Sequence, residues 1–507
     1  MKKLSYFVGI LLMRLLLPVD ASAQQQPNII LFMVDDMGWE DTSVPFWTQP
    51  TPFNHLYHTP AMERLAASGM KFTQAYASSV CSPTRISLMT GMNAARHRVT
   101  NWTLRKNIST DGKDDVLEYP QWNVNGLSPV PGIENTVYAT SLPEILRNNG
   151  YYTIHCGKAH WGAIGTPGAD PKNLGFNVNI AGHAAGGPAT YQGLNDFGNS
   201  PLDTSRKVWA IPGLEKYWGK DINLTDALTK EAILAMDTAL SIKKPFYLYL
   251  SHYTVHVPLE PDHRFYKKYK DQGLPESEAR YASMIEGMDQ SLNDILNYVG
   301  KKGIADNTII IFMSDNGGLS AHARAGTPHT QNAPLNSGKG SAYEGGIREP
   351  MIVKWPGVTP SGSTCNQYII IEDFFPTLLS IAGVNAPKTV QHVDGISFTD
   401  LLKNPGAERK LRDLYWHYPN NWGPSGPGIG ATSTIRSGDW KLIYYYRDGH
   451  SELFNIKDDI GEQHELSQRH PRKAQNLQSL LTGYLKSVDA QRPVYKATGK
   501  LAPWPGE

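Results

Sequence analysis

The sequence predicts an α/β protein with a large, mixed but mostly parallel sheet between helices, followed by a smaller antiparallel sheet with a helix. Two short apolar runs, Ile29 to Val34 and Ile309 to Met313, are continuous and stop abruptly at acidic or amide residues. Such runs indicate strands that are buried on both faces, as in a parallel sheet. Helix-like stretches and another strand lie between them, and this alternation is typical of an α/β fold.

The segments between the two runs supply the rest of the large sheet and its helices. Residues 59–70 and 278–303 have the apolar spacing of amphipathic helices, and residues 244–254 form another apolar strand. We therefore expect one large α/β domain over residues 24–385.

The pattern changes after about residue 385. Residues 433–446 predict two strands around a Ser-Gly-Asp turn, residues 451–456 predict a third strand, and residues 473–488 predict a final helix. Residues 415–431 are rich in glycine, proline and aromatic residues, which predicts an ordered loop. We expect a smaller C-terminal α+β domain over residues 386–507.

The first 23 residues have the composition of a secretory signal peptide. Lys2 and Lys3 precede a mostly apolar run from Leu4 to Leu17, and residues 21–23 read Ala-Ser-Ala. The apolar run is shorter than the roughly 20 residues that a membrane-spanning helix needs. We expect an exported protein, periplasmic or secreted, with no membrane span in the mature chain.

Composition argues against several other classes of protein. The 48 basic and 47 acidic residues nearly cancel, so no electrostatic feature favours a nucleic-acid partner. The three cysteines, Cys81, Cys156 and Cys365, are too few for a disulfide framework. The 507 residues are enough for a large globular core.

Acidic and amide side chains follow both buried strands. Asp35 and Asp36 end the first strand, and Asp315 and Asn316 end the second. Because ligands gather at the carboxyl ends of strands in an α/β sheet, we expect these side chains to share a site. Their hard oxygen atoms suit Ca²⁺ or Mg²⁺ better than zinc. The alternative is that both pairs are turn residues that cap the following helices.

Cys81 lies in the segment SSVCSPTRISLMTG, residues 78–91. Nothing beside it in the sequence predicts a histidine-activated thiolate. A cysteine phosphatase loop would need an arginine where this chain has Ser87. A buried structural thiol is therefore the simplest interpretation of the cysteine alone. The full pattern is more specific, because it reads Cys-x-Pro-x-Arg from Cys81 to Arg85 and then Thr-Gly.

On this pattern the chain resembles the type I sulfatases of the alkaline phosphatase superfamily, from about residue 27 to its end. In that family a maturation enzyme reads Cys-x-Pro-x-Arg and oxidises the cysteine to formylglycine, an aldehyde. The resemblance implies that Cys81 is modified in this way by a formylglycine-generating partner. It also implies an alkaline-phosphatase-like fold and sulfate ester hydrolysis, as in arylsulfatase-like bacterial carbohydrate sulfatases.

Other motifs of the family follow in the expected order. Gly-Lys-x-His gives Lys158 and His160, although Ala159 stands where many members have tryptophan. The strand that ends in His-x-Pro gives His256, and the lysine before Glu-Gly-Gly-x-Arg-x-Pro gives Lys339. A single lysine or histidine is usually a surface or packing residue, but their order around a complete signature favours a functional interpretation.

The resemblance also implies a mechanism. One hydroxyl of hydrated formylglycine would attack sulfur, and the other would later expel sulfate by re-forming the aldehyde. Asp315 would deprotonate the attacking hydroxyl, and Arg85 would hold the diol. His256, with Lys339, would protonate the leaving alcohol, and His160 would take the proton that triggers sulfate release.

The remaining implied roles concern charge. Lys158 would bind the sulfate together with His256 and Lys339, because the transition state spreads negative charge over oxygen. The cation would be Ca²⁺, with Mg²⁺ as the alternative. Its implied ligands are Asp35, Asp36, Asp315, Asn316 and residue 81 itself.

The expected substrate is a sulfated carbohydrate, with aryl sulfates as artificial substrates. Trp416 and His417, in the segment LYWHYP, could supply a stacking platform for sugar rings. The alternative is that these aromatic residues pack the seam between the two domains. His183 is a further candidate for substrate binding, because it lies near active-site segments in the sequence.

Two other functions are compatible with the same motifs. A phosphonate monoester or phosphodiester hydrolase of this superfamily can carry the same cysteine signature, and a non-catalytic relative could bind sulfated glycans with a decayed site. The complete motif set argues against the second function, because a binding protein has no need of a modification signature.

Overall fold

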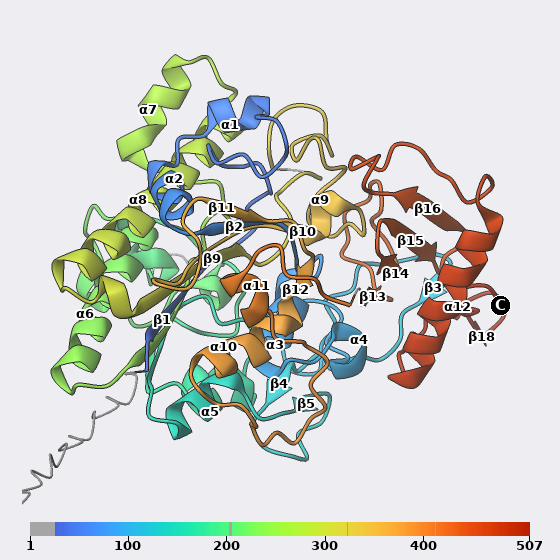
Figure 1. Ribbon diagram of the computed structural model, residues 1–507, viewed down its shortest axis with the longest axis horizontal. Coiled ribbons are helices and arrows are strands. Elements are labelled where there is room, and N and C mark those ends of the chain that lie inside the picture. Colours follow the sequence, from blue (N-terminus) through green and yellow to red (C-terminus); the bar gives the residue numbers. More distant parts are fainter. Residues whose placement is uncertain (1–25, 202–204, 322, 411) are drawn as a thin grey trace, which may run out of the picture.

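A nine-stranded mixed sheet forms the centre of the molecule (Figure 1). The computed structural model describes residues 26–201, 205–321, 323–410 and 412–507, so the predicted signal peptide lies outside the described residues. The strands run in the order β11-β2-β10-β9-β1-β8-β6-β7, and β12 pairs with β2. They are β1 (Asn28–Val34), β2 (Met70–Tyr76), β6 (Tyr152–Gly157), β7 (Val178–Ile180), β8 (Phe246–Ser251), β9 (Thr308–Ser314), β10 (Arg348–Lys354), β11 (Ser363–Cys365) and β12 (Ile369–Ile370).

Strand β1 lies between β8 and β9, and both pairings are parallel. Its register opposes Val34 to Ser314, so the residues that follow these two positions leave the sheet side by side. The main-chain N–H of Asp315 continues the ladder and donates to the carbonyl of Val34 at 3.0 Å. Strand β10 is antiparallel to its neighbours β9 and β2, so the sheet is mixed. The predicted fold class and both apolar strands are confirmed.

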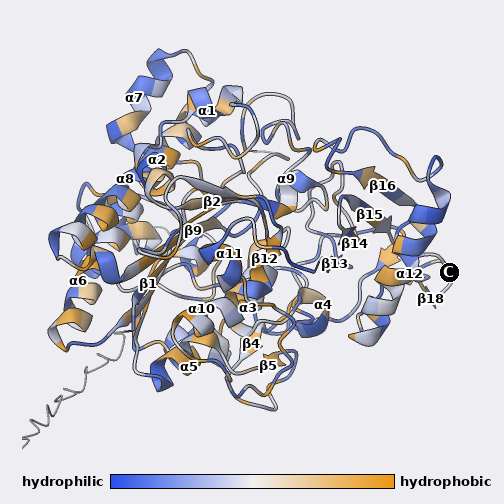
Figure 2. Ribbon diagram, viewed as in Figure 1, coloured by the Kyte–Doolittle hydropathy of each residue, from blue (hydrophilic) through white to orange (hydrophobic). Residues whose placement is uncertain are grey.

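Successive residues of β1 enter different cores, as expected for a strand buried on both faces. Ile30, Phe32 and Val34 pack with helices α2 (Pro60–Ser68), α6 (Leu224–Ser241) and α8 (Glu276–Lys301). Ile29, Leu31 and Met33 pack with α3 (Cys81–Thr90), α5 (Leu142–Asn148) and α10 (Phe374–Ile381). Figure 2 shows the apolar strands inside and the polar helix faces outside. Among the described residues, no helix combines the length and the apolarity that a bilayer crossing requires.

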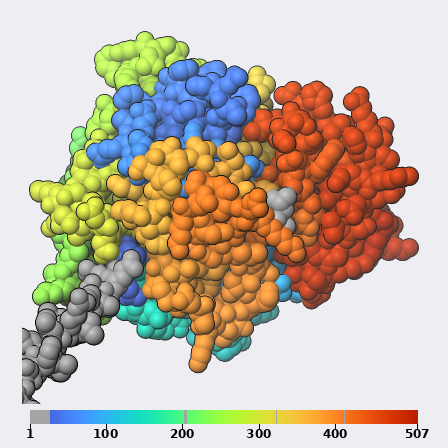
Figure 3. Space-filling model, in the orientation of Figure 1, coloured from blue at the N-terminus to red at the C-terminus, as the bar shows by residue number. Residues whose placement is uncertain are grey.

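A second, four-stranded antiparallel sheet forms a lobe beside the large sheet (Figure 3). Its order is β13-β14-β15-β16, and helix α12 packs on one face through leucine side chains. The predicted domain boundary near residue 385 stays a prediction. The elements of this lobe are β13 (Asp413–Tyr418), β14 (Thr432–Ser437), β15 (Trp440–Tyr445), β16 (Ser451–Asn455) and α12 (Pro471–Ser487).

The sequence prediction was wrong in one part of this lobe. Residues 415–418, predicted as the start of a loop, belong to β13, which pairs with β14 over six residues. The reason is long-range, because the strand is completed by its partner and by burial of Trp416, whose indole N–H donates to the carbonyl of Ala77 at 2.8 Å. The loop proper is therefore shorter and spans residues 419–431.

Short elements complete the chain. The helices are α1 (Pro52–Leu56), α4 (Ala94–His97), α7 (His263–Asp271), α9 (Glu344–Ile347) and α11 (Thr399–Lys403). The strands are β3 (Leu117–Glu118), β4 (Leu127–Ser128), β5 (Val137–Tyr138), β17 (Val494–Tyr495) and β18 (Lys500–Leu501).

A buried charge network joins the lobe to the large sheet. Lys441 of β15 is fully buried, and its Nζ lies 3.0 Å from a carboxylate oxygen of Glu344 in α9 and 2.8 Å from one of Glu462. The other carboxylate oxygen of Glu344 accepts from the hydroxyl of Tyr76 in β2 at 2.6 Å. Lys441 therefore pairs with two buried carboxylates across the seam, and Arg348 adds a second cation, with Nη1 3.3 Å from the other oxygen of Glu344.

We expect the substitution Lys441→Met to lower the free energy of unfolding by about 3–5 kcal/mol, because it leaves the buried carboxylate of Glu462 without its ion-pair partner and Glu344 with Arg348 alone. Chemical denaturation of the full chain measures the change. Lys267→Met is the matched control, since Lys267 is 83% exposed and its ion pair with Asp271 lies on the surface. Equal stability of the two variants would contradict a stabilising role for the network.

Candidate active site

Four oxygen-bearing side chains meet at the carboxyl ends of β1 and β9. Asp35, Asp36, Asp315 and Asn316 are all fully buried. Asp36 has a left-handed backbone with φ of 62°. The extended conformation of β1 therefore ends before Asp36, and the carboxylates of Asp35 and Asp36 follow a bend in the chain. Ligand atoms of Asp35, Asp36 and Cys81 lie within 4.8 Å of one another. The sheet register thus brings together the acidic pairs that the sequence placed at two strand ends.

Cys81 is the first residue of α3 and is 3% exposed. The preceding Val80 is extended, and Gly91 ends the helix in the left-handed conformation with φ of 69°. Burial raises the pKa of the Cys81 thiol, although the charges of Lys158 and Lys339 act to lower it. The unmodified side chain is therefore a thiol at neutral pH, which does not favour a thiolate nucleophile.

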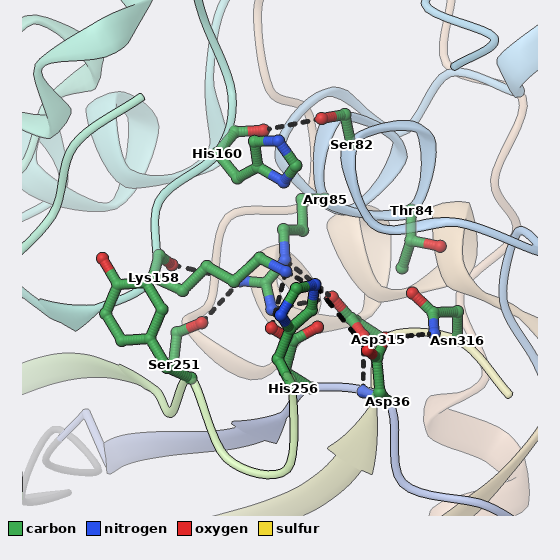
Figure 4. A network of polar contacts seen from close by, with 12 residues as sticks. Asp36, Ser82, Thr84, Arg85, Lys158, His160, Ser251, His256, Asp315 and Asn316 are labelled. Carbon is green, nitrogen blue, oxygen red and sulfur yellow. Dashed lines mark hydrogen bonds and ion pairs between the residues drawn. The ribbon is translucent and has the colours of Figure 1, made fainter. Parts of the chain in front are cut away.

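Arg85 lies one helical turn after Cys81, and its guanidinium is held on several sides (Figure 4). Its Nε donates to Oδ2 of Asp315 at 2.8 Å, and Nη2 lies 2.8 Å from the same oxygen. Nη1 donates to the carbonyl of Lys158 at 3.1 Å and to the hydroxyls of Tyr249 at 3.2 Å and Ser251 at 2.5 Å. The sheet and the helix therefore fix this cation beside the acidic cluster.

Two lysines neutralise the neighbouring aspartates. Nζ of Lys158, after β6, lies 2.6 Å from Oδ2 of Asp35, and Nζ of Lys339 lies 2.6 Å from Oδ1 of Asp36. Burial acts to raise the pKa of Asp36, but the charge of Lys339 outweighs it and leaves that pKa low. The pKa of Asp35 stays raised by burial and by the charge of Asp315, even beside Lys158. Asp35 is therefore short of positive charge.

His160 and His256 line the same site from different loops. Nε2 of His160 lies 2.8 Å from the carbonyl of Thr103, and Nδ1 of His256 lies 2.8 Å from the carbonyl of Val257. Because a carbonyl only accepts, each of these nitrogens carries a proton. The opposite nitrogen of His256 points towards Asp36, whose Oδ2 is 3.8 Å away. Burial, then Lys158 and Arg85, lower the pKa of His160 well below its usual value.

A glycine pair holds both imidazole rings in place. A Cβ at Gly186 would lie 2.3 Å from Cε1 of His160, and a Cβ at Gly187 would lie 2.7 Å from Nδ1 of His256. Only residues without side chains allow this backbone to lie directly against the two rings. The sequence analysis did not find these glycines; the run Ala-Ala-Gly-Gly after His183 is their only sequence signal.

The acidic cluster fits a hard divalent cation. Oδ1 of Asp35, Oδ2 of Asp36 and Oδ1 of Asn316 are buried and have no hydrogen-bond donor among the described residues. Buried oxygens of this kind are costly unless a donor or a cation satisfies them. Carboxylate and amide oxygens are the ligands that Ca²⁺ and Mg²⁺ prefer. The turn-capping alternative leaves these buried oxygen atoms unexplained.

A cavity of about 300 Å³ opens onto this cluster. Its charged or titratable lining residues are Asp36, Cys81, His160, His256 and Lys339. The other lining residues are uncharged and include three tryptophans, Trp102, Trp209 and Trp422. Lys158 and Arg85 do not line the cavity and lie in the fully buried part of the cluster.

Two predicted substrate-binding histidines lie elsewhere. His417 is 3% exposed, and its Nδ1 is 2.7 Å from the hydroxyl of Ser433 in the small sheet. Its neighbour Trp416 is buried in the core against the large sheet, which matches the alternative that these residues pack the seam. His183 contacts Tyr253 and does not line the cavity. Of the tryptophans that do line it, Trp422 belongs to the predicted loop over residues 415–431, whereas Trp102 and Trp209 come from segments that the sequence analysis did not single out.

The chain belongs to the sulfatase family. The family model described as Sulfatase matches residues 27–384, and one described as N-sulphoglucosamine sulphohydrolase, C-terminal, matches residues 338–491. The predicted family and the predicted enzyme class are confirmed: the protein is a sulfuric ester hydrolase with an alkaline-phosphatase-like fold.

Particular relatives agree with this assignment. A sulfatase of Formosa agariphila is 31% identical over 100% of this chain and 98% of its own length. The N-acetylgalactosamine-6-sulfatase of Mus musculus is 31% identical over 88% of this chain and 83% of its own length. The crystal structure of Ps i-CgsB in complex with k-i-k-neocarrahexaose superposes with a TM-score of 0.70 at 27% identity and covers 92% of this chain and 94% of that chain.

The contact between Gly186 and His160 can be tested directly. We expect Gly186→Ala to lower kcat on an aryl sulfate roughly 10²-fold, because the added methyl group displaces an active-site ring. Gly300→Ala is the control: at that helical glycine an added methyl group would meet no atom of the described residues within 4 Å, so activity is unchanged. Wild-type kcat in a folded Gly186→Ala variant would contradict a positioning role for this backbone.

Proposed function

We propose that this sulfatase removes sulfate from a sulfated carbohydrate through a formylglycine made from Cys81, with a divalent cation, Ca²⁺ rather than Mg²⁺, at the acidic cluster. The observation that carries the proposal is the convergence of Cys81, four buried oxygen-bearing side chains and fixed cations beside one cavity. The name of the murine relative, N-acetylgalactosamine-6-sulfatase, supports a carbohydrate substrate.

The proposed cation ligands are Asp35, Asp36, Asp315 and Asn316, with residue 81. When bound, the ion supplies positive charge that polarises sulfate oxygens and stabilises charge in the transition state. It also supplies the charge that Asp35 lacks, since the pKa of that carboxyl is raised by burial and by Asp315. The buried oxygen atoms of the cluster that lack a donor among the described residues support this assignment.

Formylglycine at position 81, in its hydrated form, supplies one hydroxyl for attack on sulfur and a second that allows sulfate to be released. Asp315 is the proposed acceptor of the proton from the attacking hydroxyl. Nε of Arg85 donates to Oδ2 of Asp315, and Nη2 lies in ion-pair distance of the same oxygen, which holds that carboxylate in position. The contacts of Arg85 are with protein groups, so its proposed contribution is charge and positioning.

Lys158, Lys339 and His256 would bind the sulfate and serve the leaving group. Burial, then the charge of Lys339, lower the pKa of His256 to about 3, so its ring is neutral in the free site at pH 7. A sulfate monoester brings a negative charge beside the ring and favours the protonated form. Nε2 would then donate to the leaving oxygen, while Nδ1 stays bound to the carbonyl of Val257.

In His160 the proton lies on Nε2, whereas in His256 it lies on Nδ1. The nitrogen of His160 that is left to act as a base is therefore Nδ1. The Nε2–H of His160 is held by the carbonyl of Thr103, which leaves Nδ1 as a buried acceptor without a partner among the described residues. Its lowered pKa keeps the ring neutral at pH 7, so the lone pair of Nδ1 is available, although the same shift makes this nitrogen a weaker base. We assign to Nδ1 the proton whose removal from residue 81 releases sulfate.

We also propose that the chain is exported to the periplasm or the medium. The support is the signal-like sequence of residues 1–23. In that compartment the enzyme would meet extracellular sulfated glycans. A formylglycine-generating enzyme would have to act on Cys81 before the helix α3 is buried, because the thiol is 3% exposed in the folded chain.

Mass spectrometry of residues 78–91 from active enzyme should show an aldehyde, or its hydrate, in place of the Cys81 thiol. Cys81→Ala should lower turnover of an aryl sulfate by roughly 10³-fold or more, because the nucleophile is lost. Cys365→Ala is the control, since that buried cysteine lies in β11, away from the cavity. A plain thiol in fully active enzyme would refute the proposed nucleophile.

Chelation should lower both activity and thermal stability, and Ca²⁺ should restore both better than Mg²⁺. A cation that binds only the folded state adds about 2.7 kcal/mol to the free energy of unfolding at a hundredfold excess over its Kd. The stability change should be weaker but still present in Cys81→Ala, where no turnover interferes and the carboxylate ligands remain, and should be lost in Asp36→Asn. Asp306→Asn, on an exposed turn, is the control and should keep the full response. Stability that does not respond to any divalent cation would contradict the site.

A further inference from the structure

Three tryptophans from three different loops line the catalytic cavity. Its titratable lining residues form a charged floor, which consists of Asp36, Cys81, His160, His256 and Lys339. Trp102 follows α4, Trp209 ends a short 3-10 helix, and Trp422 lies in the loop between β13 and β14. Each side chain is only partly buried. The rings of Trp102 and Trp209 have centroids 6.4 Å apart at an interplanar angle of 40°, and Nζ of Lys339 is 6.0 Å from the ring of Trp422. The indoles therefore lie within reach of a group bound at the reactive cluster.

The loops that carry Trp102 and Trp422 both donate hydrogen bonds to the carboxylate of Asp111. Asp111 accepts from the side-chain amides of Asn101 at 2.8 Å and Asn420 at 3.2 Å, one on each loop. It also accepts from the main-chain N–H of the residue before Trp422 at 3.3 Å. The two tryptophan loops are thus held relative to each other by one side chain, which acts as a positioning residue.

Two further contacts position Trp422 and Trp209. A Cβ at Gly340 would lie 2.1 Å from Cε3 of Trp422, so the absence of a side chain there lets the indole pack beside Lys339. The carbonyl of Trp209 accepts from the main-chain N–H of Ala189 at 2.8 Å, which ties it to the loop that carries Gly186 and Gly187. The tryptophans are therefore built into the segments that position the reactive residues.

Charge is distributed unequally over the cavity. Its titratable lining residues all belong to the sulfate-binding floor, and each lysine of that floor is already paired with an aspartate. Apart from the tryptophans, the walls consist of Val80, Gly186, Val257, Leu319 and Pro424. Among the described residues that line the cavity, the walls thus offer no cation for a second anionic group.

We propose that Trp102, Trp209 and Trp422 form an aromatic clamp for an uncharged sugar ring that carries a single sulfate ester, and that the enzyme discriminates against rings with a second charge. This inference rests on the proposed carbohydrate sulfatase function and names its substrate class. Indole faces stack on the apolar C–H faces of a pyranose. A second sulfate or carboxylate on the same ring would be desolvated against these walls without a partner, which is strongly unfavourable.

Binding experiments in the Cys81→Ala background test the clamp without turnover. We expect Trp422→Ala and Trp209→Ala each to weaken binding of a monosulfated N-acetylhexosamine roughly 3- to 10-fold, and Trp422→Phe to restore most of it. The dissociation constant of inorganic sulfate should not change, because sulfate contacts only the floor. Trp218→Ala is the matched control, since Trp218 is 37% exposed and lies outside the cavity lining. Equal weakening of sulfate and sugar sulfate would overturn the clamp and indicate a general structural effect.

Matched substrate pairs test the charge rule in the wild-type enzyme. The pairs are N-acetylgalactosamine 4-sulfate or 6-sulfate against the 4,6-disulfate, and N-acetylglucosamine 6-sulfate against glucosamine 2-N,6-O-disulfate. We expect kcat/KM to fall at least roughly 10²-fold for the doubly charged member of the pair that is turned over. Equal rates, or turnover of aryl sulfates without any of these sugars, would overturn the clamp for uncharged sugars. Failure to hydrolyse any sulfate ester would instead refute the proposed function.

Discussion

The parallel register of β1 and β9 is the constraint on which the site depends. By opposing Val34 to Ser314, it sends Asp35 and Asp315 out of the sheet as neighbours, in a region where both are fully buried. Burial, and then repulsion by the charge of Asp315, raise the pKa of Asp35. The arrangement is stable only if positive charge is brought to the same place.

The rest of the chain meets that demand from separate segments. Lys158 follows β6, Arg85 lies in α3, and Lys339 lies in a loop that leads to α9, so distant parts of the sequence each supply one cation. Every one of them is fixed by a carboxylate rather than by solvent. The backbone at Gly186 and Gly187 also packs directly on the rings of His160 and His256, which leaves these rings little room to move.

The strand ends could be predicted from the sequence because a buried strand and its terminal carboxylates are local features. The predicted residue roles came from the order of motifs that resemble a known family. The structure brings Lys158 and Lys339 to the acidic pair beside Cys81, and His160 and His256 to the cavity that Cys81 lines. The cavity walls could not be predicted in this way. A tryptophan in a loop has no periodic pattern, and its position depends on contacts with residues hundreds of positions away. The same limit explains β13, which becomes a strand only through its pairing with β14.

The small sheet has a further consequence for the active site, since the loop that carries Trp422 connects two of its strands. The position of that indole relative to Lys339 therefore depends on how the small sheet packs against the large one. Glu344, which binds Lys441 across the seam, lies only a few residues after Lys339, so one short segment both contributes a cation to the cavity and anchors the lobe. The charged floor is thus supplied by the large sheet and the aromatic wall partly by the small one. Sequence changes in the loops of the lobe can alter the substrate while the chemistry of the floor is kept.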